Sequence, residues 1–102
     1  MNNCCQDNNE DYKKVEESTD LLRAISEPNR LRILCVLSKK KICVCDLANE
    51  LNIPQNLNSF HLKTLYDVGI LKRERDGNTI YYLIKKDWKK RIEKIFEFLD
   101  IK

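Results

Sequence analysis

Five cysteines are the residues of this 102-residue chain whose side chains could bind a metal ion or change oxidation state. Cys4 and Cys5 are adjacent, Cys43 and Cys45 are separated by one residue, and Cys35 stands alone among apolar residues. Thiolates are the ligands that soft metal ions prefer, and a pair of thiols can also form a disulfide. The cysteines are therefore candidate ligands or sensors, except Cys35, which we expect to fill the core as a small apolar residue.

The cellular compartment decides how these thiols are used. The polar, acidic start of the chain lacks the layout of a signal peptide, and no apolar run is long enough to span a bilayer. We therefore expect a cytoplasmic protein without membrane contact. In a reducing compartment, cysteines serve as ligands, sensors or core residues more often than as a disulfide framework.

The Cys43 and Cys45 pair lies where a short apolar segment leads into a helix that carries Leu47 and Leu51. Inside a helix, side chains two positions apart diverge, but at the start of a helix both sulfurs can meet one ion. A helix N-terminus also favours the thiolate form. Two thiolates supply half of a tetrahedral site, so further ligands must come from elsewhere.

The elements that position this pair follow from the apolar pattern. Residues 1–10 are polar and are predicted to form a flexible N-terminal arm, and residues 11–102 a single folded domain. The first helices are expected from about Asp11 to Ile25, where a break could fall at Ser18 or Thr19, and from Pro28 to Leu37.

Two further helices are joined by a short turn. The first is the helix that follows Cys45, and the second begins at Pro54 and ends before Gly69. Three or four residues between them indicate a helix-turn-helix. Residues 70–75 and 79–84 then read as two strands that bend at Asp76 and Gly77, which is the hairpin called a wing.

The last segment, residues 87–101, is amphipathic. Its apolar stripe consists of Trp88, Ile92, Ile95, Phe96 and Leu99. So large a stripe on a terminal helix predicts a partner surface, and burial against a second copy would enlarge the small core of a 102-residue chain. The predicted fold class is mostly α (α+β): a winged helix-turn-helix with a two-stranded hairpin and a helical dimer interface.

The charge is divided unevenly between the two parts of the chain. Residues 1–20 carry a net charge of −4 and the remainder carries +7. A basic body suits a polyanion such as DNA, although a solvated lysine-rich surface would give the same balance. His61 is the only histidine, which makes a Cys/His enzyme remote, and the cysteine spacings are not those of a zinc finger. We expect no enzymatic activity.

The string CVCDLANELNIPQNLNSFHLKTLYDVGILKRERDGNTIYYLI, residues 43–84, together with AISEPNRLRIL upstream, resembles the ArsR/SmtB family of metalloregulatory repressors. The resemblance implies a homodimer paired through its first and last helices. It also implies that the metal-free dimer binds double-stranded operator DNA with dyad symmetry and leaves the DNA when a metal ion binds.

The resemblance also identifies a recognition helix, because Ser59-x-His61-Leu62 matches the family motif. Amide and hydroxyl groups on this helix can reach base edges, and lysine can meet phosphate. The predicted DNA-contacting residues of this helix are Gln55, Asn56, Ser59, Phe60, His61 and Lys63. For His61 a structural hydrogen bond is an equal alternative.

Two features beside the motif extend this interpretation. Arg73 and Arg75 precede the Gly77 bend, as in the family's Arg-x-Gly wing, and are predicted to contact phosphates or enter the minor groove. Asn58 stands in the stripe of Leu62 and Leu65, where family members usually have an apolar residue. Either the helix is slightly rotated or Asn58 has a buried partner.

Cys43-Val44-Cys45 resembles the Cys-Val-Cys metal box of the family's cadmium, lead and arsenic sensors. Ala48 stands where one branch of arsenite sensors has a third cysteine, whereas CadC-type sensors take cysteines from an N-terminal arm, commonly that of the other subunit. Cys4 and Cys5 are the candidates for that role. The favoured ions are Cd(II) and Pb(II), followed by As(III), with Zn(II) a further option. The alternative is a repressor of the same fold that senses oxidants through a thiol-disulfide switch without a metal.

Overall fold

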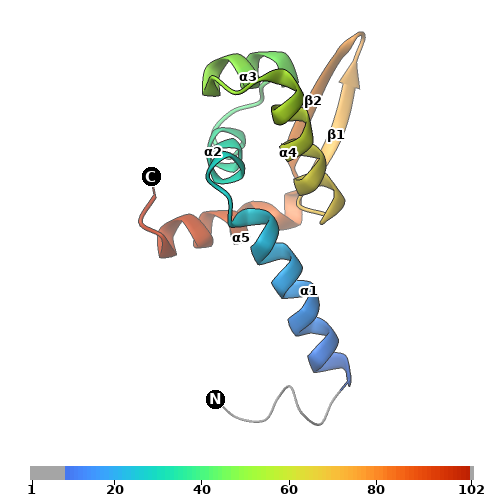
Figure 1. The fold of residues 1–102 in the computed structure, drawn as a ribbon, viewed down its shortest axis with the longest axis vertical. Helices are drawn as coiled ribbons and strands as arrows, with labels where there is room; N and C mark the ends of the chain where they lie inside the picture. The colour runs from blue at the N-terminus through green and yellow to red at the C-terminus, as the bar shows by residue number, and fades with distance from the viewer. Residues whose placement is uncertain (1–8, 102) are drawn as a thin grey trace.

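The computed structural model describes residues 9–101, and in them five helices and one antiparallel hairpin follow one another (Figure 1). The elements are α1 (Asn9–Ile25), α2 (Pro28–Leu37), α3 (Val44–Leu51), α4 (Gln55–Asp67), β1 (Leu71–Asp76), β2 (Thr79–Ile84) and α5 (Lys86–Phe98). This is the predicted winged helix-turn-helix. None of the helices in residues 9–101 combines the length and the apolar character needed to cross a membrane.

Local chemistry fixes the helix boundaries close to where the sequence predicted them. The carboxylate of Glu27 caps α2 by accepting from the backbone N–H of Arg30, and Pro28 occupies the first turn. Asn52 ends α3 with a left-handed φ of 56°. After α4, Gly69 has a φ of 91°, a conformation that glycine adopts without strain.

Two expectations were wrong in detail. Helix α1 begins at Asn9 rather than near Asp11 and continues without a break through Ser18 and Thr19. The Thr19 hydroxyl donates to the carbonyl oxygen of Val15, 2.8 Å away, so its hydrogen bond stays within the helix instead of interrupting it.

The turn of the hairpin lies one residue later than predicted. Asp76 pairs with Thr79 at the end of the ladder, which leaves Gly77 and Asn78 as the two turn residues. Gly77 has a φ of 64°, which is why a glycine suits this turn.

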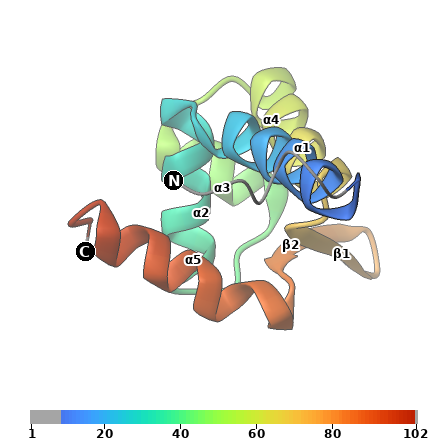
Figure 2. The ribbon, with the colours of Figure 1, turned by 90° about the horizontal axis from the view of Figure 1, so that it is seen from below.

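The core is shared by all the helices and the base of the hairpin. Ile33 and Leu34 of α2, Leu62 and Leu65 of α4 and Ile92 of α5 are fully buried. The views show α3 and the tip of the hairpin at one end of the molecule, whereas α1 and α5 lie toward the other end (Figures 1 and 2).

Candidate nucleic-acid interface and thiol site

The outer face of α4 carries the polar residues predicted to read DNA. Gln55, Asn56, Ser59 and Lys63 are exposed, and Phe60 is 59% exposed beside them. The Lys63 ammonium forms an ion pair with Asp67 one turn further along the helix, at 3.0 Å. This face therefore offers amide, hydroxyl and ammonium groups on one rigid helix.

The wing carries its two arginines in different surroundings. Both are exposed, but the Arg75 side chain donates from Nε to the carbonyl oxygen of Gly77, 3.1 Å away, which holds it at the turn. The Arg73 guanidinium lies over the ring of Tyr66, 5.4 Å from its centroid, and so rests against α4. Arg75 thus places a positive charge at the hairpin tip, whereas Arg73 places one where the hairpin meets α4.

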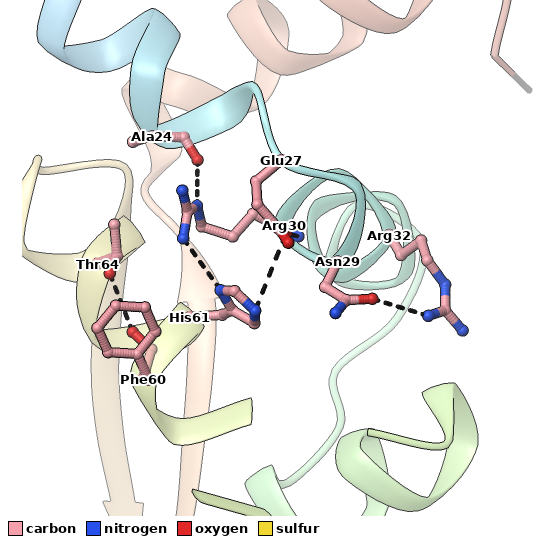
Figure 3. Close-up of polar contacts among 8 residues, drawn as sticks. All are labelled: Ala24, Glu27, Asn29, Arg30, Arg32, Phe60, His61 and Thr64. Carbon is pink, nitrogen blue, oxygen red and sulfur yellow. Dashed lines mark hydrogen bonds and ion pairs between the residues drawn. The ribbon is translucent and has the colours of Figure 1, made fainter. Parts of the chain in front are cut away.

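His61 does not lie on that outer face. Its side chain is buried, and Nδ1 is 3.0 Å from an Arg30 guanidinium nitrogen (Figure 3). Because guanidinium can only donate, Nδ1 accepts and the ring proton is on Nε2, which faces a Glu27 carboxylate oxygen at 3.9 Å. In the structure His61 therefore makes the hydrogen bond of the structural alternative, and the residue, only 4% exposed, does not lie on the exposed face of α4 that is predicted to contact DNA.

This cluster joins the α1–α2 junction to α4. Arg30 also donates from Nε to the carbonyl oxygen of Ala24 at the end of α1 (Figure 3). Partial burial would raise the pKa of Glu27, but its neighbours together lower it. They are the hydrogen bond from the backbone N–H of Arg30, the His61 ring whose Nε2 faces the carboxylate, the hydrogen bond from the backbone N–H of Asn29 and the charge of the Arg30 guanidinium. The carboxylate is consequently held in its charged form. The sequence analysis did not identify Arg30 as a partner of His61. The signal that could have indicated it is a charged residue within the largely apolar segment that forms α2.

Asn58 is fully buried on the inner face of α4, and its amide nitrogen donates to the carbonyl oxygen of Val44 at the start of α3, 3.1 Å away. Of the two alternatives, the buried partner is the one observed. The Asn58 carboxamide oxygen has no hydrogen-bond partner among the described residues. Leu57 beside it is 38% exposed.

The thiol pair begins α3. Cys43 is the N-cap residue, is half-buried and forms an isolated backbone bridge with Tyr81 of β2. Cys45 is exposed. Both line an open hollow whose other walls come from α3, α4 and the wing: Val44, Ser59, Asn78, Thr79, Ile80 and Tyr82. The wing residues of this hollow were not predicted, because more than thirty residues separate them from Cys45 in the sequence.

The remaining cysteines differ in what the structure says of them. Cys35 is half-buried and packs against the core, as expected. Cys4 and Cys5 lie outside the described residues. Within residues 9–101, no group of three or more Cys, His, Asp or Glu side chains is arranged to hold a metal ion. The described part of one chain thus brings two of the four predicted thiol ligands to one hollow.

Comparison with known proteins decides the family. A family model described as "Bacterial regulatory protein, arsR family" matches residues 27–73. An HTH-type transcriptional regulator of Methanocaldococcus jannaschii, MJ1325, is 35% identical over 86% of this chain and 97% of its own length. The chain belongs to the ArsR/SmtB family of DNA-binding transcriptional regulators.

Other family members carry informative names. The arsenical resistance operon repressor of Staphylococcus xylosus is 31% identical over 84% of this chain and 80% of its own length. The cadmium resistance regulator CadC of Listeria innocua is 34% identical over 62% of this chain, and the match spans about half of CadC, 54%. The crystal structure of NolR from Sinorhizobium fredii is similar with a TM-score of 0.81 at 30% identity, covering 93% of this chain and 96% of NolR.

Proposed function

We propose that this ArsR/SmtB regulator is a repressor that binds operator DNA as a homodimer and is released when a thiophilic ion binds Cys43 and Cys45. The observation that carries the proposal is the position of the two thiols. They line one hollow with Ser59 of α4 and Thr79 of the wing, so a ligand there touches both elements proposed to read DNA.

The proposed DNA surface combines α4 and the wing. Gln55, Asn56, Ser59, Phe60 and Lys63 would lie toward the major groove, and Arg73 and Arg75 along phosphates or in the minor groove. His61 positions this helix from inside instead of contacting DNA.

The proposed dimer uses the opposite end of the molecule. Helix α1 exposes Tyr12, Val15 and Leu22, and the end of α5 exposes Phe98, the last at 87%. Apolar side chains gathered on two terminal helices are typical of an interface that a second copy covers. A dimer of this kind would present two copies of α4 to successive half-sites of the operator.

The thiol pair fits a soft ion chemically but supplies only two ligands. Cys45 is exposed, and Cys43 caps a helix whose N-terminus favours anions. Cys4 and Cys5 are the proposed source of the other ligands. Cd(II) and Pb(II) are the favoured ions, followed by As(III), with Zn(II) a further option; the names of CadC and the arsenical repressor accord with Cd(II) and As(III).

The direction of α1 favours the partner subunit as the source of the arm cysteines. Helix α1 runs away from α3 (Figure 1), and its 17 residues extend about 26 Å. Cys5 precedes Asn9 by four residues, which span at most about 14 Å. An arm that starts at the far end of α1 is badly placed to return to Cys43 of its own chain, so we propose that it reaches the partner's α3.

In the proposed switch, an ion bound to Cys43 and Cys45 also binds the arm cysteines, and so it links the arm to the start of α3. Cys43 also carries the backbone bridge to Tyr81, so a shift at the start of α3 is transmitted to the wing. Asn58 ties the same turn of α3 to α4. The ligand-bound geometry of the dimer would no longer match two successive major grooves, and by linkage DNA must weaken ion binding by the same factor.

Fluorescence anisotropy of the reduced full-length protein on its own promoter region tests the proposal. Cd(II), Pb(II), As(III) and Zn(II) are titrated into the protein–DNA complex. We expect at least one ion to weaken DNA binding about 10-fold or more, within the usual range of allosteric coupling. Cys43→Ser should abolish the response, Cys4→Ser/Cys5→Ser should weaken it, and Cys35→Ser is the matched control that should preserve it.

The redox alternative is tested in the same assay with peroxide. Release by peroxide that dithiothreitol reverses, with no response to any ion, would replace metal sensing with a thiol-disulfide switch. Absence of promoter binding by the reduced protein would overturn the proposal as a whole.

A further inference from the structure

We infer that Phe60 contacts the 5-methyl group of thymine in the major groove, and that this contact makes the protein prefer thymine at that position of its operator. The inference rests on the proposed function, in which α4 enters the major groove, and deepens it by naming what one side chain recognises. The carrying observation is a large apolar side chain exposed within a polar helix face. Phe60 is 59% exposed, and its exposed neighbours on that face are Asn56, Ser59 and Lys63.

The Phe60 ring is supported on one side and open on the other. It approaches the His61 ring at 61°, with centroids 5.6 Å apart (Figure 3). His61 is buried and is held by Arg30, so this contact fixes one side of the phenyl group. Leu57, three positions earlier on the same side of α4, is also exposed. Leu57 and Phe60 therefore form a short apolar strip that their own chain leaves uncovered.

The chemistry of the major groove restricts what such a strip can contact. A phenyl ring has no hydrogen-bond donor or acceptor, whereas nearly every group on the base edges of the major groove is a donor or an acceptor. Against those groups the ring would displace water without replacing its hydrogen bonds, which costs free energy. The exception is the 5-methyl group of thymine, where contact buries apolar surface on both partners.

The neighbours of Phe60 along the helix suit the same base pair. Asn56 lies one turn earlier, and a carboxamide is the group that pairs with N6 and N7 of adenine. Thr64 lies one turn later, and its hydroxyl donates to the carbonyl oxygen of Phe60, 3.0 Å away, so that proton is used within the helix. An A·T pair offers an adenine to the amide and a methyl group to the ring. We therefore expect A·T pairs where Asn56 and Phe60 meet the operator.

Replacement of thymine by deoxyuridine tests the inference, because it removes the 5-methyl group and keeps the hydrogen-bonding groups of the base. A footprint of the full-length protein on its promoter region locates the half-sites. Duplexes in which one thymine at a time is replaced are then compared by fluorescence anisotropy. We expect at least one thymine per half-site whose replacement lowers affinity about threefold or more, the effect of burying roughly one methyl group.

Variants of α4 assign this preference to Phe60. Phe60→Ala should bind the thymine and uracil duplexes equally at that position, whereas Phe60→Leu, which keeps an apolar side chain, should retain part of the preference. Lys63→Ala is the matched control: it removes a charge from the same face and should weaken binding to both duplexes by the same factor. Each protein is compared with itself on two duplexes, so partial unfolding of a variant does not alter the ratio.

The outcomes separate this inference from the proposed function. Promoter binding that no thymine replacement weakens would overturn the inference and leave the function, as would a thymine preference that Phe60→Ala retains. A fall in the dimer association constant of Phe60→Ala, measured by sedimentation equilibrium, would assign the ring to a protein interface instead. Absence of promoter binding by the unmodified protein would overturn both proposals together.

Discussion

Glu27, Arg30 and His61 connect the junction between α1 and α2 to the middle of α4 through a buried imidazole and two partly exposed charged side chains. Arg30 reaches the last turn of α1 and the His61 ring together, while Glu27 caps α2 and faces the same ring. Helix α4 is thus attached from inside by polar contacts as well as by Leu62 and Leu65. Such a cluster has its full effect only when each partner is present.

The lowered pKa of Glu27 gives a pH test of this cluster. Because the folded pKa is below the value of an unfolded glutamate, about 4.3, the stabilisation is complete above that value and is lost as pH falls through the folded pKa. We expect Glu27→Gln to lower the free energy of unfolding at pH 7 by about 1 kcal/mol, the size of one hydrogen bond to a partly exposed charge. Thermal unfolding of the unmodified protein and of Glu27→Gln at pH 7 and at pH 3 measures the difference in their free energies of unfolding. This difference should be smaller at pH 3. A pH-independent difference would show that the carboxylate charge is not the cause.

Asn58 allows a second test at this scale. Its buried carboxamide oxygen has no partner among the described residues, which costs free energy, and the surrounding stripe is apolar. We expect Asn58→Leu to raise the free energy of unfolding by about 1 kcal/mol in urea denaturation. Asn56→Leu, on the exposed face of the same helix, is the control and should change it by less than about 0.5 kcal/mol. Strong destabilisation by Asn58→Leu would mean that the bond to Val44 outweighs the unpaired oxygen.

At the scale of elements, the wing is held at two places. The Cys43–Tyr81 bridge attaches β2 to α3, and the Arg73 guanidinium rests on Tyr66 of α4. Arg75 is left at the turn, bonded to Gly77. The hairpin is therefore a rigid extension of the helix-turn-helix whose tip presents a positive charge.

If the wing tip contacts DNA and α5 does not, removing a positive charge should have different effects at these two places. We expect Arg75→Ala to weaken promoter binding and to reduce the slope of log affinity against log salt concentration by about 1, the loss of one phosphate contact. Arg91→Ala on α5, where the guanidinium lies over the Trp88 ring, is the matched control and should leave the slope unchanged. Anisotropy at several salt concentrations measures both. Equal slopes for Arg75→Ala and the unmodified protein would remove Arg75 from the DNA surface.

At the scale of the whole molecule, α1 and α5 carry exposed apolar side chains at the end away from α3 and the wing tip (Figures 1 and 2). Leu22 is 63% exposed and Phe98 is 87% exposed. Large apolar side chains exposed to this extent are typical of a surface that a partner covers. The proposed dimer would cover this surface.

A charge placed in this surface tests the dimer. We expect Leu22→Glu/Phe98→Glu to weaken dimerisation by at least about a hundredfold, because two carboxylates would be buried without partners. Sedimentation equilibrium measures the association, and operator affinity should fall in parallel. Leu57→Glu, the same kind of change on α4, should leave the association constant unchanged. A monomeric unmodified protein, or a dimer that tolerates the double change, would contradict the proposed interface.

The sequence alone determined the order of the elements and most of their boundaries, because caps and breakers act over a few residues. Pro28, Gly69 and the apolar stripe of α5 are signals of this local kind. The Cys43 and Cys45 pair and the exposed face of α4 were also predictable, since residue type and helical spacing suffice to define them.

Tertiary packing decided the rest, because the partners are distant in the sequence. His61 lies in the recognition motif, and only the approach of Arg30, 31 residues earlier, shows that its ring faces inward. The walls of the thiol hollow combine α3 with Ile80 and Tyr82, which no periodicity within either segment could bring together. Local patterns state which face of an element is apolar or reactive, whereas the fold alone determines what that face meets.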